Sequence, residues 1–273
     1  MDRWMMRVLA VMWAAAGVGG FSAQVSAALI DDMNDTSLAE YTLTKVLDQG
    51  AGTSNISFAS PSGSLLVGSS GTTGAEQVLL LRDDASLAVG DMLLADVTGT
   101  WANWDRDIGI AVGFTKTPTG LGDPAAGDVR TTYVEVSARA NNQIVAFARN
   151  GAANLTSGQE FAGTTYGGVS FSVANPISLY IARLATNTFE VGWIQGSTRH
   201  AITANGTAIM PYTITDANVP GAAVGFYADV RANRASSPVG LDNLRTIPIP
   251  EPSALALLAA ALVPMRRRRG RPV

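Results

Sequence analysis

The chain has 273 residues and a formal net charge of −3 at neutral pH, with no cysteine and a single histidine. This composition excludes thiolate nucleophiles and zinc sites built from cysteine and histidine. The central part, residues 28–246, carries 20 acidic and 12 basic side chains and thus a net charge of −8, which argues against nucleic acid as a partner.

The first 27 residues have the order of a secretory signal peptide. A basic start with Arg3 and Arg7 precedes an apolar stretch over 8–18, and Val25-Ser26-Ala27 supplies the small residues at which signal peptidase cuts. A buried N-terminal helix is the alternative. The order of the three parts favours a signal peptide over 1–27, removed after Ala27. Removal of the signal peptide leaves residues 28–246 as one domain, which is long enough to bury a core.

Residues 28–246 contain no convincing run of apolar residues at helical spacing. They contain short stretches rich in Val, Ile, Thr, Tyr and Phe, separated by Gly, Asn, Asp and Ser, which is typical of strands. The pattern predicts strands over 41–48, 56–59, 64–68, 76–82, 91–98, 107–115, 132–138, 143–149, 169–173, 177–184, 188–194, 199–203, 222–230 and 239–245.

The character of these strands predicts how they pack. In the stretch YVEVSA, Tyr133 and Glu135 face opposite to Val134 and Val136, whereas 78–81 and 108–114 are apolar on both faces and suit inner strands. Turns over 185–188 and 195–197 join three strands into an antiparallel meander. We therefore expect an all-β domain of two packed antiparallel sheets, a jelly-roll sandwich. A closed barrel is the alternative.

Three phrases give a resemblance to a known fold family. LIDDMND at 29–35, GAAVGFYADVRA at 221–232 and VGLDNLR at 239–245 are similar to the first and last strands of concanavalin A-like lectin and glucanase sandwiches. The resemblance covers most of residues 28–246. It implies that the first and last strands of the domain lie together in one sheet.

The sequence offers little support for catalysis. The single histidine, His200, follows a turn and has no nucleophile motif beside it, so a solvent-facing strand histidine is the preferred interpretation. The glucanase signature places Glu, Asp and Glu at alternate positions of one strand. Here Glu76, Glu135 and Glu190 each stand alone on a strand, so no catalytic residue is carried over and we predict no enzyme.

Two kinds of binding site remain as hypotheses. Aromatic platforms for sugar binding are offered by Trp101, Trp104 and Trp193, with Tyr166 and Tyr227 as further candidates, although rings of this kind usually serve packing. A structural calcium ion could bind Asp31 and Asp32 in the first strand and Asp242 or Asn243 in the last, if these strands pair as the resemblance implies. Solvated acidic strand ends are the alternative.

The C-terminal residues 247–273 have three parts. Pro250-Glu251-Pro252 is followed by an apolar segment over 253–265 and by the cluster Arg266, Arg267, Arg268 and Arg269. At about 1.5 Å per residue the apolar segment reaches only ~20 Å, less than the ~30 Å hydrocarbon core of a bilayer. The arginines are expected to stay on the cytoplasmic side. A plain tail anchor is the rival interpretation.

This order closely resembles the PEP-CTERM sorting signal. The resemblance implies a substrate of an exosortase-type membrane enzyme, held transiently in the inner membrane by a short transmembrane segment and then released to the cell surface or outside. It also implies an association with exopolysaccharide and biofilm. We therefore expect an exported, non-enzymatic surface or extracellular-matrix protein. A lectin-like carbohydrate-binding module is the alternative, and a divergent glycoside hydrolase is a third hypothesis.

Overall fold

The computed structural model describes the central part of the chain. Its described residues are 27–48, 56–61, 63–69, 76–99, 107–113, 132–139, 143–150, 153–154, 175–202, 204–205, 208–209, 211–214, 222–230 and 239–249. The predicted signal peptide and the sorting motif lie outside these ranges, except for Ala27, and the predictions for them stay predictions. Among the described residues no helix is long and apolar enough to cross a membrane.

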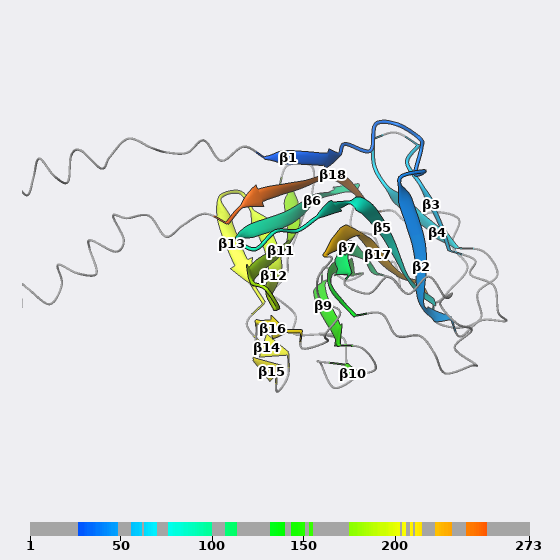
Figure 1. Ribbon diagram of the computed structural model, residues 1–273. Helices are drawn as coiled ribbons and strands as arrows, with labels where there is room; N and C mark the ends of the chain where they lie inside the picture. The colour runs from blue at the N-terminus through cyan, green and yellow to red at the C-terminus, as the bar shows by residue number, and fades with distance from the viewer. Residues whose placement is uncertain are drawn as a thin grey trace, which may run out of the picture.

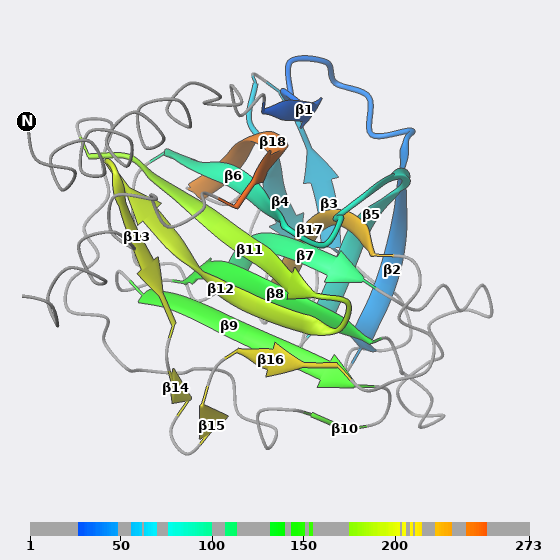
Figure 2. The ribbon, with the colours of Figure 1, turned by 60° about the vertical axis from the view of Figure 1, so that its left-hand side comes forward.

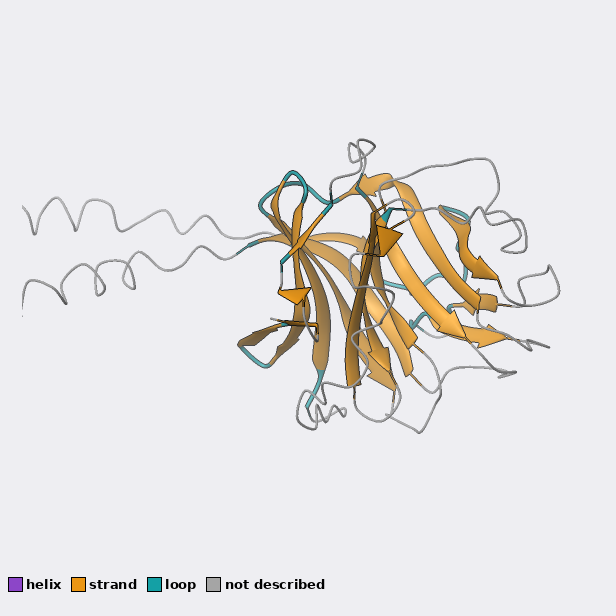
Figure 3. Cartoon of the chain, turned by 90° about the horizontal axis from the view of Figure 1, so that it is seen from below, coloured by secondary structure: helices purple, strands orange, loops and turns teal. Residues whose placement is uncertain are grey.

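Within the described ranges the chain forms strands and turns, without a helix (Figure 3). The strands are β1 (Ala28–Asp31), β2 (Tyr41–Asp48), β3 (Ile56–Ala59), β4 (Leu66–Ser69), β5 (Glu76–Ser86), β6 (Asp91–Gly99), β7 (Asp107–Gly113), β8 (Tyr133–Arg139), β9 (Gln143–Asn150), β10 (Ala153–Asn154), β11 (Ile177–Ala185), β12 (Thr188–Gln195), β13 (Thr198–Ala201), β14 (Ala204–Asn205), β15 (Ala208–Ile209), β16 (Tyr212–Thr213), β17 (Ala223–Val230) and β18 (Val239–Pro248).

Two seven-stranded sheets contain most of these strands (Figures 1 and 2). The β6 sheet has the order β1-β18-β6-β11-β12-β13, with β16 pairing β12, and the β7 sheet has the order β10-β9-β8-β7-β17-β5-β2. The strand pairs are antiparallel throughout. The chain changes between these two sheets from β1 to β2, β5 to β6, β6 to β7, β10 to β11, β16 to β17 and β17 to β18, as jelly-roll sandwiches do.

The prediction of an all-β fold with two antiparallel sheets is confirmed. Most strand bounds agree to within two residues, but β5 runs on to Ser86 and β18 to Pro248, because both continue along a neighbouring strand. The predicted strand over 169–173 lies outside the described residues. The meander is confirmed as β11-β12-β13, with two-residue turns at 186–187 and 196–197, and Gly196 adopts the positive φ (60°) that its turn requires.

The main hydrophobic core lies between the two sheets. It draws Leu93, Leu179 and Val191 from the β6 sheet and Ile110 and Phe226 from the β7 sheet. The two stretches predicted to be apolar on both faces, 78–81 and the described part of 108–114, are buried on both faces. The β7 sheet therefore also has a buried outer face, turned away from the β6 sheet.

The first and last strands of the domain pair with each other. β1 runs antiparallel to β18, with Ala28 opposite Thr246 and Leu29 opposite Arg245. This confirms what the resemblance to concanavalin A-like sandwiches implied about the terminal strands. The pairing places the start of β1 next to the end of β18, so the points where the chain enters and leaves the sandwich are neighbours.

Candidate functional site

Polar and aromatic side chains gather on the outer face of the β7 sheet. Strict alternation along β7 sends Ile108, Ile110 and Val112 into the core between the sheets. The residues between them, and their counterparts on neighbouring strands, therefore face outward. We call the following set the outer face: Gln77, Leu79, Leu81, Asp107, Gly109, Ala111, Tyr133, Glu135, Ser137, Arg139, Phe147, Tyr227 and Asp229.

A row of four polar residues crosses one end of this face. The register pairs Arg139 with Asp107, Asp107 with Asp229, and Asp229 with Gln77, so the row spans β8, β7, β17 and β5. Arg139 donates from Nε to Asp107 Oδ1 at 2.6 Å and from a terminal nitrogen to Oδ2 at 2.5 Å. Gln77 Nε2 donates to Asp229 Oδ2 at 3.1 Å. Both carboxylates are buried and partnered.

Aromatic rings occupy the middle of the face. Tyr133 and Tyr227 stack across β8 and β17 with ring centroids 6.1 Å apart, and Phe147 lies 5.9 Å from Tyr133. Burial raises the pKa of Tyr227 well above its ordinary value, and the neighbouring charge of Asp229 raises it further. Tyr227 is therefore a neutral phenol at any working pH. It is one of the aromatic residues that the sequence indicated for sugar binding.

A third carboxylate, that of Glu135, lies on the same face as the two tyrosines. It accepts a hydrogen bond from Ser137 Oγ, two residues along the same strand, and it is buried. Its outward position agrees with the predicted alternation of YVEVSA. Glu190, the other isolated glutamate, lies on the β6 sheet with Tyr180 and Arg199 as partners. The two glutamates therefore cannot act as a pair on one substrate.

Small residues take the outward positions of β7, the strand between the two that carry the tyrosines. Along β7, Gly109, Ala111 and Gly113 take the outward positions after Asp107. At Gly109 an added Cβ would collide with the carbonyl oxygen of Val136, so the neighbouring backbone requires glycine there. The small residues of β7 thus lie between the two strands whose tyrosines, Tyr133 and Tyr227, stack on each other.

This arrangement offers a sugar the groups that carbohydrate sites use. The carboxylates of Asp107, Glu135 and Asp229 can accept hydrogen bonds from hydroxyl groups, and the tyrosine rings provide apolar faces. No cation and no cofactor is needed for such contacts. The side chains of this set are buried, so binding at this face requires that they become accessible.

The structure places the predicted tryptophan platform only in part. Trp101 and Trp104, with Tyr166, lie outside the described residues. Trp193 belongs to the main core, is 6% exposed and stacks on His200 with centroids 5.0 Å apart and the rings 10° from parallel. This is the position of a packing residue, the alternative that the sequence left open. His200, the other ring of this stack, is half-buried and not fully solvent-facing.

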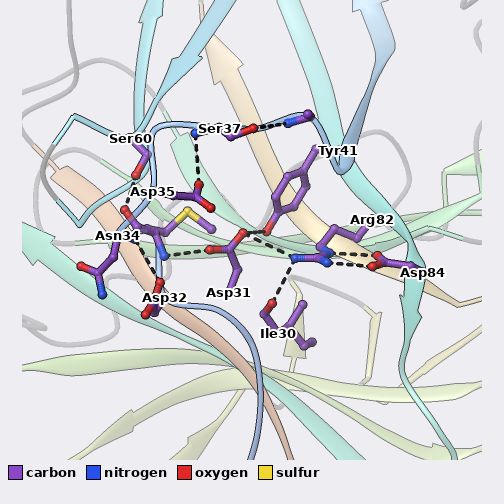
Figure 4. A network of polar contacts seen from close by, with 12 residues as sticks. Ile30, Asp31, Asp32, Asn34, Asp35, Ser37, Tyr41, Ser60, Arg82 and Asp84 are labelled. Carbon is purple, nitrogen blue, oxygen red and sulfur yellow. Dashed lines mark hydrogen bonds and ion pairs between the residues drawn. The ribbon is translucent and has the colours of Figure 1, made fainter.

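The aspartates proposed for calcium divide into two groups. Asp31 accepts hydrogen bonds from the Met33 amide at 2.8 Å and from the Tyr41 hydroxyl at 2.9 Å (Figure 4). A terminal nitrogen of the Arg82 guanidinium lies 3.6 Å from Asp31 Oδ2 and forms an ion pair with it. Arg82 also donates to the Ile30 carbonyl at 3.0 Å. Since Tyr41 and Arg82 belong to the β7 sheet, this network joins β1 of one sheet to β2 and β5 of the other.

Asp32 and Asp242 share a different neighbourhood. Burial raises the pKa of Asp242, and the charges of Asp96 and Asp32 raise it further. Asn243, in a positive-φ conformation at the β18 bulge, donates from its side chain to Asp242 at 3.0 Å and to Asp96 at 3.3 Å. Arg245 pairs with both oxygens of Asp96. Across the described residues, no group of three or more His, Asp or Glu side chains is placed to hold a metal ion.

Replacing Asp31 with asparagine tests these alternatives. We expect a loss of about 1–3 kcal/mol of unfolding free energy, because Tyr41 and Arg82 lose a charged, mostly buried partner. The loss should be the same with calcium and with a chelator present, as measured by urea unfolding. A calcium-dependent gain in stability that disappears in both Asp32→Asn and Asp242→Asn would instead support the predicted cation site.

Sequence reasoning missed most of the polar row. Asp107, Asp229 and Arg139 are separated widely along the chain and meet only through strand register. Two local signals were available. In DIGIAVG, residues 107–113, small residues alternate with large β-branched ones. In FYADV, residues 226–230, Tyr227 and Asp229 are two positions apart and therefore face the same side of the sheet. The sorting-motif residues Pro250, Glu251, Pro252 and Arg266 to Arg269 lie outside the described residues.

Comparisons with known proteins give a likeness of architecture only. No family model and no curated protein matches the chain. Among solved structures, a Bacillus subtilis protein of unknown function with a galectin-like fold has a TM-score of 0.47 at 8% identity, covering 82% of this chain and 97% of that one. The metal-free carbohydrate recognition domain of Emp46p has a TM-score of 0.44 at 13% identity, covering 81% and 94%.

A xylan β-1,4-xylosidase from Bacillus halodurans C-125 also has a TM-score of 0.44, at 12% identity. The matched region is 80% of this chain but 38% of the xylosidase, so the chain spans well under half of that enzyme. At these scores nothing about the ligand or activity of this chain follows from the likeness.

Proposed function

We propose that this protein is exported and binds carbohydrate through the outer face of the β7 sheet without hydrolysing it. The observation that carries the proposal is the gathering of Asp107, Glu135 and Asp229 with Tyr133 and Tyr227 on one face of one sheet. Hydrogen-bond acceptors beside stacked rings are the groups with which proteins recognise sugars. The concanavalin A-like pattern of the terminal strands supports the same class.

The routing part of the proposal rests on the two ends of the chain. A signal peptide over 1–27 would direct export. The Pro-Glu-Pro motif, the apolar segment and the arginine cluster would then hold the chain transiently in the inner membrane for an exosortase-type enzyme. The product would work at the cell surface or in the extracellular matrix, where exopolysaccharide is the natural ligand for a sugar-binding face.

The binding proposal is tested by two glutamate variants and a glycan array. Glu135→Gln is expected to weaken binding about tenfold or more, since a charged hydrogen bond to a sugar hydroxyl contributes roughly 1.5–3 kcal/mol. Glu190→Gln is the matched control, because Glu190 also accepts a hydrogen bond from a side-chain hydroxyl, that of Tyr180, but lies on the other sheet. Equal binding by the wild type and both variants, with the fold intact by circular dichroism, would contradict the proposal.

The absence of hydrolysis is tested on the ligand that the array identifies. We expect no release of reducing sugar, because the other two carboxylates of this face, those of Asp107 and Asp229, are already hydrogen-bonded to Arg139 and Gln77. Turnover by the wild type that disappears in Glu135→Gln would make the protein a divergent glycoside hydrolase instead.

The routing is tested separately by mass spectrometry of the mature protein from its native cell. An N-terminus at Ala28 and loss of the tail near Pro250 are expected, and an intact chain through Val273 would contradict it.

A further inference from the structure

The chain enters and leaves the sandwich at one end of the β6 sheet. β1 begins at Ala28, opposite Thr246, and β18 ends at Pro248, opposite Asp91 at the start of β6 (Figure 1). The turn before β6 and the hairpin between β11 and β12 lie at this same end, because β6 pairs with both β18 and β11.

Backbone hydrogen bonds join these segments to one another. The Ile249 amide donates to the Gly90 carbonyl at 2.8 Å, and the Gly90 amide donates to the Arg183 carbonyl at 2.9 Å. The Arg183 guanidinium donates to the carbonyls of Leu87 at 2.8 Å and Thr186 at 3.1 Å. The fold therefore holds the chain as far as the residue that precedes Pro250, and no free linker separates the domain from the Pro-Glu-Pro motif.

The exposed surface at this end is apolar and uncharged. Its exposed residues are Ala28, Ala88, Val89, Gly90, Leu184, Ala185, Thr186 and Pro248, which we call the tethered end. Val89 is 53% exposed and Leu184 is 41% exposed. Across the described residues the exposed large hydrophobic side chains are these two with Leu29 and Leu43, and Leu29 lies on β1, beside β18.

We infer that the tethered end docks on the surface of the lipid bilayer while the C-terminal segment holds the chain in the membrane. The inference rests on the proposed routing. Three residues, 250–252, separate the last held residue from the apolar segment, a reach of roughly 10 Å in extended conformation. This short connection brings the tethered end to the interface, where Val89 and Leu184 leave water.

The composition of this surface indicates that docking is driven by burial of apolar side chains and not by attraction between charges. Its exposed side chains carry no charge and cleavage after Ala27 would add a single amino group at Ala28, so contact with the bilayer depends less on anionic lipid and on low salt than that of a basic patch. Two such side chains bury little area, so they add to the hold of the C-terminal segment and do not replace it.

The test uses single cysteines, which is straightforward because the native chain has none. The exported chain with an intact C-terminal segment carries an environment-sensitive fluorophore at position 89, 184 or 43 and is inserted into phosphatidylcholine vesicles that contain an acyl-chain quencher. We expect a blue shift and loss of emission at 89 and 184. Leu43 is the matched control, since it is 43% exposed but lies on β2 of the other sheet, and its label should be unaffected.

Other outcomes separate the inference from the proposal on which it rests. A chain that floats with the vesicles but is not quenched at 89 and 184 overturns the docking alone. A chain that does not float with them overturns the proposed routing and the docking together. A blue shift at 89 and 184 that rises with protein concentration without vesicles also overturns the inference, because it shows contact between copies of the chain.

Discussion

Arg139→Met is expected to lower the free energy of unfolding by about 3–5 kcal/mol, the cost of leaving a buried carboxylate without its cation. The side chain of Asp107 is 3% exposed and that of Arg139 is 18% exposed, so water cannot replace the lost guanidinium. The cost is raised by Asp229, which lies directly opposite Asp107 and repels it. Urea unfolding at neutral pH measures the effect.

Two controls identify the cause of this destabilisation. Arg199→Met breaks the ion pair with Glu190. The side chain of Arg199 is 30% exposed and that of Glu190 is 26% exposed, so this variant is expected to lose about 1 kcal/mol of unfolding free energy or less. The double variant Asp107→Leu with Arg139→Met should be more stable than Arg139→Met alone, because it removes the unpaired charge. The deficit of Arg139→Met should also shrink as the pH falls, since protonation neutralises the carboxylate. Equal costs for the two arginine variants would contradict the argument.

The polar row shows what the sequence could predict and what it could not. Alternation within a strand is local, so the outward position of Glu135 beside Tyr133 followed from YVEVSA alone. The partner of a strand is not local. Asp107 and Asp229 meet because β7 pairs with β17, which lies more than a hundred residues later in the chain. No local period carries that information, and so the carboxylates were judged one strand at a time.

The terminal strands show the opposite case. Their pairing is a long-range feature, and it was expected correctly because LIDDMND and VGLDNLR resemble the ends of a known sandwich. The same phrases suggested calcium, yet Asp31 is engaged by Tyr41 and Arg82 in a network that joins the two sheets. A strand pattern can indicate which backbones are neighbours, whereas the partner of a carboxylate depends on side chains from other strands.

Trp193→Ala is expected to lower the free energy of unfolding by about 3–5 kcal/mol and to leave carbohydrate binding unchanged at temperatures where the variant is folded. The indole is 6% exposed within the main core and stacks on His200, so its removal leaves a large cavity between the sheets. Urea unfolding and binding to the same glycan array measure the two quantities on one preparation.

Trp193→Phe completes this test, because phenylalanine keeps an aromatic ring in the core and should restore part of the lost stability. A platform for sugar would behave in the opposite way, with little loss of stability and a large loss of binding in Trp193→Ala. The outer face predicts the complementary result, namely that Glu135→Gln weakens binding while the core around Trp193 is unaffected. The two residues lie on different sheets, in β8 and β12, so their effects on stability should add. Strong coupling between the two variants in glycan binding would instead mean that the ligand reaches the space between the sheets and not the outer face.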